Sequence, residues 1–173
     1  MRPAPDRDGG PEGDSDPPPD YEARAHDICL RLLTVRARTR VELAAALARR
    51  GIPEEPVERV LDRLAEVGLV DDAAVAQAVV ETYTARGLAR RAVAAKLHQR
   101  GVPDDAVGAA LAGLPPDQEI DGARALVSRR QRQLSGLPPQ TQARRLAGQL
   151  ARRGYSAEVV SRVVREAVAQ LDP

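Results

Sequence analysis

Apolar and polar positions recur along this chain in one pattern that occurs three times. The stretches 47–57, 97–107 and 150–160 each contain a leucine, then an arginine directly before a glycine, and an apolar valine six residues after that glycine. The glycines, Gly51, Gly101 and Gly154, lie 50 and 53 residues apart. Self-similarity at a fixed period is the signature of a repeat protein. The chain is therefore expected to consist of three copies of one unit.

Each copy of the pattern predicts a tight joint between two helices. The apolar residues before the glycine follow a period of 3.6 and end in arginines, which suit the negative end of a helix dipole. Glycine adopts the left-handed conformation that ends many helices. Proline or serine and then acidic residues follow, as is typical of the start of a helix. We interpret the motif as serving folding rather than chemistry.

The same reasoning predicts helices along the whole chain after residue 20. Thr39 and Glu42 have the spacing of a capping box, in which each side chain satisfies a backbone amide of the first turn. No segment shows the alternation of a strand. Helices are expected over residues 21–35, 40–51, 53–67, 72–87, 89–100, 103–112, 117–134, 140–153 and 156–171. The predicted fold is all-α, with three tandem three-helix repeats in an elongated, curved, solenoid-like body.

The first residues form a different kind of segment. Residues 1–20 contain six prolines, three glycines and five aspartates, and too few apolar side chains to offset the entropy of ordering. We expect a disordered, acidic tail over 1–20, followed by repeats over 21–70, 71–115 and 116–173. The net charge of +1 averages two unlike parts, because residues 1–22 have a balance of −5 and the remainder a balance of +6. A basic helical body indicates an anionic partner.

Composition and motifs exclude several classes of function. A single cysteine, Cys29, excludes an internal disulfide framework and a Cys-x-x-Cys zinc site. His26 and His98 have no partner ligands at useful spacing, and no phosphate-binding loop is present. We therefore predict no enzymatic activity, no cofactor and no metal site. No run of about 18 apolar residues exists, so we predict no membrane span, and we expect a cytoplasmic monomer.

Arginines cluster at the entry to the second helix of each repeat and in the first helix of the third. Such clusters, repeated in stacked units, are expected to form a stripe along one side of the body. The stripe could follow a phosphate backbone or an acidic groove of a protein polymer. The predicted partner-binding residues are Arg36, Arg38, Arg40, Arg86, Arg90, Arg91, Arg124, Arg129, Arg130, Arg132, Arg144 and Arg145.

A second hypothesis is a helix–turn–helix protein that binds DNA, such as a transcription regulator. Residues 39–64 have the required order of a capped helix, a glycine turn and a second amphipathic helix. The second helix would enter the major groove, yet it carries five acidic residues against Arg59 and Arg63. Its net charge of −3 would be repelled by phosphates, which argues against reading of a DNA sequence.

Several motifs, taken in order, resemble one known family. They are Leu30-Arg31-Leu32-Leu33 followed by Arg36 and Arg38, Glu42-Leu43, Arg50-Gly51-Ile52, Gly68-Leu69-Val70-Asp71-Asp72, Arg100-Gly101-Val102 and Leu150-Ala151-Arg152-Arg153-Gly154-Tyr155-Ser156. The pattern resembles the RecX family of bacterial recombination regulators from about Tyr21 to the end. The family usually has Gly-x-Gly where this chain has Gly87-Leu88-Ala89.

The resemblance implies a partner and a function. Members of the family are three repeated three-helix units that bind the helical groove of the RecA recombinase filament and span neighbouring protomers. They inhibit ATP hydrolysis, strand exchange and co-protease activity, and so act in DNA repair, recombination and the SOS response. We therefore expect a non-catalytic regulator that binds the RecA filament through the arginine stripe, with non-specific DNA contact as a further possibility.

Overall fold

The computed structural model describes residues 20–169, which form nine α-helices and no strand within that range. The helices are α1 (Tyr21–Val35), α2 (Arg40–Ala48), α3 (Glu54–Glu66), α4 (Asp72–Ala85), α5 (Arg90–Gln99), α6 (Asp104–Ala112), α7 (Pro116–Leu134), α8 (Pro139–Arg152) and α9 (Ala157–Ala169). The all-α prediction is confirmed, and so is the grouping into three three-helix domains.

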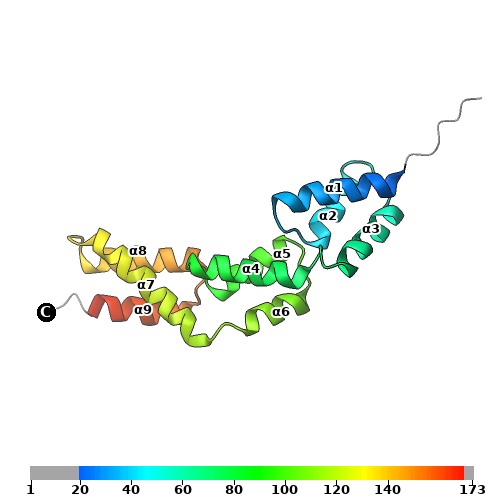
Figure 1. The fold of residues 1–173 in the computed structure, drawn as a ribbon. Coiled ribbons are helices and arrows are strands. Elements are labelled where there is room, and N and C mark those ends of the chain that lie inside the picture. The colour runs from blue at the N-terminus through cyan, green and yellow to red at the C-terminus, as the bar shows by residue number, and fades with distance from the viewer. Residues whose placement is uncertain (1–19, 170–173) are drawn as a thin grey trace, which may run out of the picture.

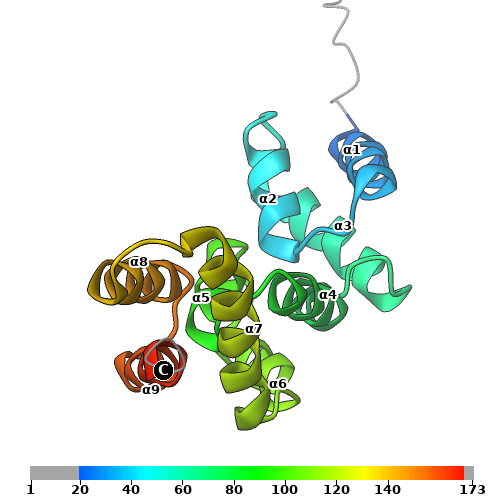
Figure 2. The ribbon, with the colours of Figure 1, turned by 90° about the vertical axis from the view of Figure 1, so that its left-hand side faces the viewer.

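The three domains follow one another along an elongated body (Figure 1). Helices α1–α3 lie at one end, α4–α6 in the middle and α7–α9 at the other end. Seen from the end that holds α7–α9, the domains are offset from one another rather than aligned in a straight column (Figure 2). The predicted disorder concerns residues that, except for Asp20, lie outside the described part of the chain. Asp20 itself caps α1, because its side chain accepts a hydrogen bond from the backbone N–H of Ala23 at 2.9 Å.

Each domain has its own apolar core, which consists mainly of leucine, valine and alanine. The first core includes Leu43, Leu47 and Leu61, and the second includes Val80, Val93 and Leu97. The third includes Leu126, Leu146, Leu150 and Tyr155, and it also takes in Ala89 from the second domain. The second and third domains therefore share buried apolar contact, whereas the cores of the first and second domains are separate.

The repeated motif forms the same joint in all three domains. Gly51, Gly101 and Gly154 have φ angles of +72°, +74° and +87°, the left-handed conformation that a Cβ disfavours. The residue after each glycine donates its N–H to the carbonyl of the leucine five residues earlier, at 3.3, 3.1 and 3.2 Å. This is the Schellman arrangement at the end of a helix. It explains why leucine, glycine and a following apolar or tyrosine residue recur at fixed spacing.

The capping box that the sequence indicated forms at the start of α2, and an aspartate side chain caps α4. In the capping box, the Thr39 hydroxyl accepts from the N–H of Glu42 at 3.1 Å, and the Glu42 carboxylate accepts from the N–H of Thr39 at 3.2 Å. Asp71 accepts from the N–H of Ala74 at 2.9 Å and caps α4. The predicted boundaries differ by up to three residues from those observed, mainly because the glycines and arginines of the joints lie beyond the last helical turn.

Candidate partner-binding surface

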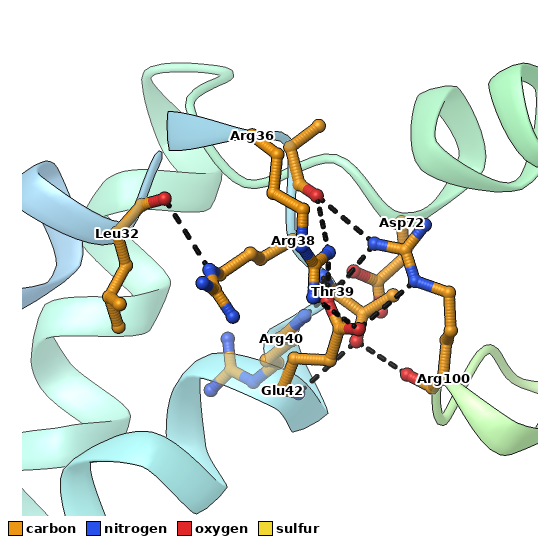
Figure 3. Close-up of polar contacts among 9 residues, drawn as sticks. Leu32, Arg36, Arg38, Thr39, Arg40, Glu42, Asp72 and Arg100 are labelled. Atoms are coloured by element: carbon orange, nitrogen blue, oxygen red, sulfur yellow. Dashed lines mark hydrogen bonds and ion pairs between the residues drawn. The ribbon is translucent and has the colours of Figure 1, made fainter. Parts of the chain in front are cut away.

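The first two domains meet at a charged junction (Figure 3). Arg100, from the joint of the second domain, donates from Nε to Oε1 and from Nη2 to Oε2 of Glu42 in α2, each at 3.0 Å. Arg36 donates to the same carboxylate from Nη1 and Nη2 at 3.0 and 3.1 Å. The Thr39 hydroxyl donates to the carbonyl oxygen of Arg100 at 2.6 Å. The two residues of the α2 capping box therefore also bind the second domain.

The electrostatics of Glu42 follow from this arrangement. Burial opposes ionisation of its carboxyl, but the hydrogen bonds from Arg100 and Arg36 and from the backbone of Thr39 outweigh that effect and lower its pKa from 4.5 to about 2. The carboxylate is thus charged over the physiological range, and it holds two arginines in place. Arg36 is accordingly engaged within the protein.

The other predicted residues of the first domain are also held by the chain itself. Arg40 pairs with Asp62, Nη1 to Oδ1 at 2.7 Å, and with Glu58, while its backbone N–H donates to Asp72 at 2.8 Å. Arg38 is half-buried and donates from Nε to the carbonyl of Leu32 at 3.4 Å. In a structural role, these side chains order the turn between α1 and α2 and the start of α2. Whether they also contact a partner stays a prediction.

The second and third domains meet through buried contacts rather than ion pairs. Tyr155 is 4% exposed, and its hydroxyl donates to the carbonyl of Gly87 at 3.3 Å. The N–H of Ala89 donates to the carbonyl of Arg153 at 2.9 Å, and the Arg153 guanidinium donates to the carbonyl of Arg86. Burial raises the pKa of the Tyr155 hydroxyl above its ordinary value of 10.0. The side chain of Arg86, a predicted site residue, lies 5.6 Å from the ring centre of Tyr83.

Arg90 and Arg91 line a hollow between the second and third domains. This hollow has a volume of about 1060 Å³, and small residues of α8 such as Ala147 and Gly148 form part of its wall. Arg90 donates from Nη1 to the carbonyl of Leu114 at 3.2 Å. Arg91 is exposed and forms no ion pair with any residue between 20 and 169. Both side chains therefore present charge to solvent at the domain boundary.

The predicted arginines of α7 divide into two kinds. Arg124 binds the Glu166 carboxylate through Nε and Nη2 at 2.9 and 3.1 Å, which lowers the pKa of Glu166. Arg124 thus joins α7 to α9. Three others, Arg129, Arg130 and Arg132, are exposed and form no ion pair with a described carboxylate.

An adjoining hollow of about 490 Å³ gathers arginines from two helices. Arg130 of α7 meets Arg144, Arg145 and Arg152 of α8 there, with Gly148 and Gln149 between them. None of the four arginines forms an ion pair with the described carboxylates. Gly148 also lines the hollow beside Arg90 and Arg91, so the two hollows adjoin at this residue of α8. We call this set the basic surface: Arg90, Arg91, Arg130, Arg144, Arg145 and Arg152.

Four of the six arginines of the basic surface lie in the third domain, which has the largest net charge of the three. Residues 116–169 contain ten arginines and five carboxylates, a balance of +5. Arg152 is a member that the sequence reasoning missed, because its place in the repeated motif made it look like a helix-end residue. The signal was available, since Arg152 follows Arg145 by seven residues on the same helix and so lies on the same face.

Other kinds of site find little support within the described residues. No group of three His, Cys, Asp or Glu side chains there could hold a metal ion. Cys29 is buried, and burial raises the pKa of its thiol. Over residues 20–169, no helix is both long and apolar enough to cross a membrane. The α3 helix, which a helix–turn–helix reader would insert into DNA, has Arg59 and Arg63 bound to Glu22 at 2.6 and 3.0 Å.

Comparison with known proteins gives one consistent result. Three family models match the chain in order: the first three-helix domain of RecX over residues 25–64, the second over 71–111 and the third over 117–164. The chain is 56% identical over 158 residues to "Regulatory protein RecX" of Thermobifida fusca, which covers 91% of this chain and 85% of that protein. It is 47% identical over 169 residues to the protein of that name from Streptomyces coelicolor, with 94% and 90% covered.

Solved structures share the same fold. A crystal structure of RecX from Lactobacillus salivarius superposes with a TM-score of 0.76 at 18% identity, over 86% of this chain and 97% of that chain. A second crystal structure, of regulatory protein RecX, superposes with a TM-score of 0.74 at 25% identity, over 83% and 73% of the two chains. The arrangement of three successive three-helix domains is therefore common to all three molecules.

Proposed function

This chain belongs to the RecX family of regulatory proteins, which are not enzymes, and we propose that it binds the RecA nucleoprotein filament and inhibits its activities. The inhibited activities are ATP hydrolysis, strand exchange and co-protease function in DNA repair and recombination. The chain acts as a monomer in the cytoplasm, by occupying the groove of the filament and spanning neighbouring protomers. No chemical step by the chain itself is required.

The basic surface is the observation that supports this proposal most directly. It presents six arginines along α8 and the boundary of the second and third domains, without carboxylate partners in the described chain. Desolvated arginines recognise carboxylate and phosphate groups through paired hydrogen bonds. A filament of protein and DNA offers both groups. The surface therefore suits either acidic side chains in the filament groove or the phosphates of the bound DNA.

Ion pairs within the chain reduce the number of predicted stripe arginines that are available to a partner. Arg36, Arg40 and Arg124 satisfy carboxylates of their own chain. Binding of these arginines to a partner would cost the chain the hydrogen bonds and ion pairs that they now form with those carboxylates. The unpaired arginines of the second and third domains have no such cost. We therefore propose that the basic surface attracts the filament at long range. The three consecutive domains allow the chain to contact several protomers at once, which increases its avidity.

The test compares two charge reversals of equal size. Arg144→Glu/Arg145→Glu changes the basic surface, whereas Arg24→Glu/Arg31→Glu changes two exposed arginines of α1 that have no ion-pair partner in residues 20–169. The assay measures inhibition of ATP hydrolysis by RecA filaments assembled on single-stranded DNA. We expect the first variant to raise the concentration for half-inhibition at least tenfold, and the second to change it less than threefold.

Three results would count against the proposal. No binding or inhibition by the unchanged protein rejects the function itself. Equal losses in the two variants show that only net charge matters, and no loss in either removes the basic surface from the interaction. Binding to a duplex of defined sequence without recombinase would support the helix–turn–helix hypothesis instead, which the acidic α3 helix disfavours.

A further inference from the structure

The two domain junctions follow one rule of docking. In each, the glycine joint of the later domain rests on the first turn of the second helix of the earlier domain. A Cβ built on Gly101 would lie 2.6 Å from Cβ of Val41 in α2, and one on Gly154 would lie 2.7 Å from Cβ of Ala92 in α5. Both contacts are closer than real Cβ atoms approach. The absence of a side chain at these glycines therefore allows the domains to meet.

Polar groups of the joint take part in the same way at both junctions. The carbonyl of the arginine before the glycine accepts a hydrogen bond from the N-cap residue of the earlier helix, which is Thr39 for Arg100 and Ala89 for Arg153. The guanidinium of that arginine then reaches a carbonyl just before the earlier helix, that of Ala37 at 3.0 Å for Arg100. For Arg153 it reaches the carbonyl of Arg86. Each joint thus makes three contacts with a helix start.

The joint of the first domain has the same groups, but no helix start within the described part of the chain lies against it. Among the described residues, nothing lies within 4 Å of a Cβ built on Gly51. The carbonyl of Arg50 accepts no hydrogen bond there. The Arg50 guanidinium folds back on its own helix and donates to the carbonyl of Ala46 at 2.7 Å. Arg50 and Gly51 are both exposed.

A second copy of this chain does not offer a helix start that fits. The starts of α2 and α5 are already occupied by the joints of the next domains. The third, α8, begins fifteen residues before its glycine, whereas α2 and α5 begin eleven residues before theirs. The residue that corresponds to Thr39 is Gln142, which lies inside α8 rather than at its N-cap. Its side chain is buried and donates from Nε2 to the carbonyl of Leu137 at 2.9 Å. The third domain therefore lacks the N-cap donor that receives a joint, and within residues 20–169 no helix start lies against the joint at Gly51.

We infer that the joint of the first domain, Arg49–Ile52, docks onto the exposed start of a helix in the partner protein. The partner helix has an N-cap residue that donates to the carbonyl of Arg50, and a small or β-branched residue in its first turn that packs on Gly51. A carbonyl or carboxylate at that helix start binds the Arg50 guanidinium, as Ala37 and Glu42 bind Arg100. The inference rests on the proposed function, because it assigns this helix to a protomer of the RecA filament.

Neighbouring arginines provide a matched test of the docking. Arg50→Glu and Arg49→Glu change the net charge equally, at adjacent exposed positions of the same helix end. The residues equivalent to Arg49, Gln99 and Arg152, make no hydrogen bond to the preceding domain. We expect Arg50→Glu to weaken binding to RecA filaments at least tenfold and Arg49→Glu to weaken it less than threefold. Circular dichroism checks that both variants are folded.

The outcomes separate this inference from the function that it rests on. Binding by the unchanged protein together with equal binding by Arg50→Glu overturns the docking and leaves the proposed function standing. Equal losses in the two variants also overturn it, because they show simple charge attraction. No binding by the unchanged protein rejects both.

A crosslink identifies the kind of surface that is contacted. The only natural cysteine, Cys29, is 0% exposed, so Arg49→Cys can be labelled selectively with a photoreactive maleimide. After irradiation with RecA filaments, peptide mapping is expected to place the crosslink in the first turn of a helix or in the residues just before it. Arg24→Cys on α1 is the control, and its crosslinks are expected elsewhere. A crosslink from Arg49→Cys to the middle of a helix or to a strand would overturn the inference.

Discussion

Arg100 and Glu42 lie 58 residues apart in the sequence and form a two-pronged ion pair between the second and first domains. The equivalent pair at the next junction does not exist, because the residue that corresponds to Glu42 is Ala92 and Arg153 binds a backbone carbonyl instead. Beyond the contacts that the two junctions share, the first therefore has an ion pair and the second has buried contacts of Tyr155 and Ala89. The two junctions should respond differently to the same change of conditions.

Glu42→Gln keeps the size of the side chain and removes its charge. We expect the first domain to move more freely relative to the second, because two arginines lose the charge of their common partner at a cost of about 1–3 kcal/mol. Spin labels at Arg24→Cys and Gln99→Cys report the distance between the two domains, and the distribution is expected to broaden. Glu58→Gln is the control, since it removes an ion pair within the first domain. An equal broadening in the control would contradict the assignment.

The charge of Glu42 also predicts a dependence of stability on pH. Its pKa is about 2 in the folded protein and 4.5 when unperturbed, so the ionised form contributes stability that is complete above pH 4.5 and is lost as the pH falls towards 2. The shift corresponds to at most about 3 kcal/mol. We expect the difference in unfolding free energy between the natural chain and Glu42→Gln to be constant from pH 5 to 8 and to shrink below 4.5. Urea titrations at several pH values measure it, and a difference that persists at pH 2 would point to shape rather than charge.

The helices could be predicted from the sequence because their signals are local. The Schellman joints at Gly51, Gly101 and Gly154 require residues within six positions of one another, and so does the capping box of Thr39 and Glu42. Backbone geometry fixes these spacings, so they can be recognised in the sequence alone. The sequence repeat then indicates that the same glycine joint between two helices occurs three times.

The contacts between domains could not be predicted in the same way. Glu42 was accounted for by the capping box, and Gly101 by its positive φ, so neither residue called for a second role. The structure gives both a second role at the junction. A similar effect concealed Arg152, which has the properties of a helix-end residue and also belongs to the basic surface. Residues that satisfy a local rule can serve a distant contact, and only the three-dimensional arrangement reveals it.

Tyr155 is expected to stabilise the junction of the second and third domains chiefly through its ring. Tyr155→Phe removes one hydrogen bond of 3.3 Å and should lower the unfolding free energy of the third domain by about 0.5–1.5 kcal/mol. Tyr155→Ala removes the buried ring as well and should cost about 3–5 kcal/mol. Hydrogen exchange of the backbone amides in α7–α9 measures both. Equal effects of the two substitutions would show that the hydroxyl, rather than the ring, carries the contact.

The glycines of the three joints provide the sharpest comparison, because they share a backbone conformation and differ in their surroundings. Alanine at any of them incurs the cost of a positive φ, about 1–2 kcal/mol. Gly51→Ala should cost no more than this, since no described atom lies near its Cβ position. Gly101→Ala should also separate the first domain from the second, because its Cβ would overlap Val41.

Two measurements distinguish these effects in the glycine variants. Urea unfolding gives the cost to each chain, and the spin-label distance between the first and second domains shows whether the junction has opened. Gly51→Ala is expected to keep the natural distance, and Gly101→Ala to lengthen or broaden it, since moving the domains apart relieves the overlap at less cost than compressing Val41. If both variants kept the natural distance, the closeness of Gly101 to α2 would not be what positions the first domain. The repeated glycine would then serve the turn alone, and the docking rule drawn from the two junctions would fail with it.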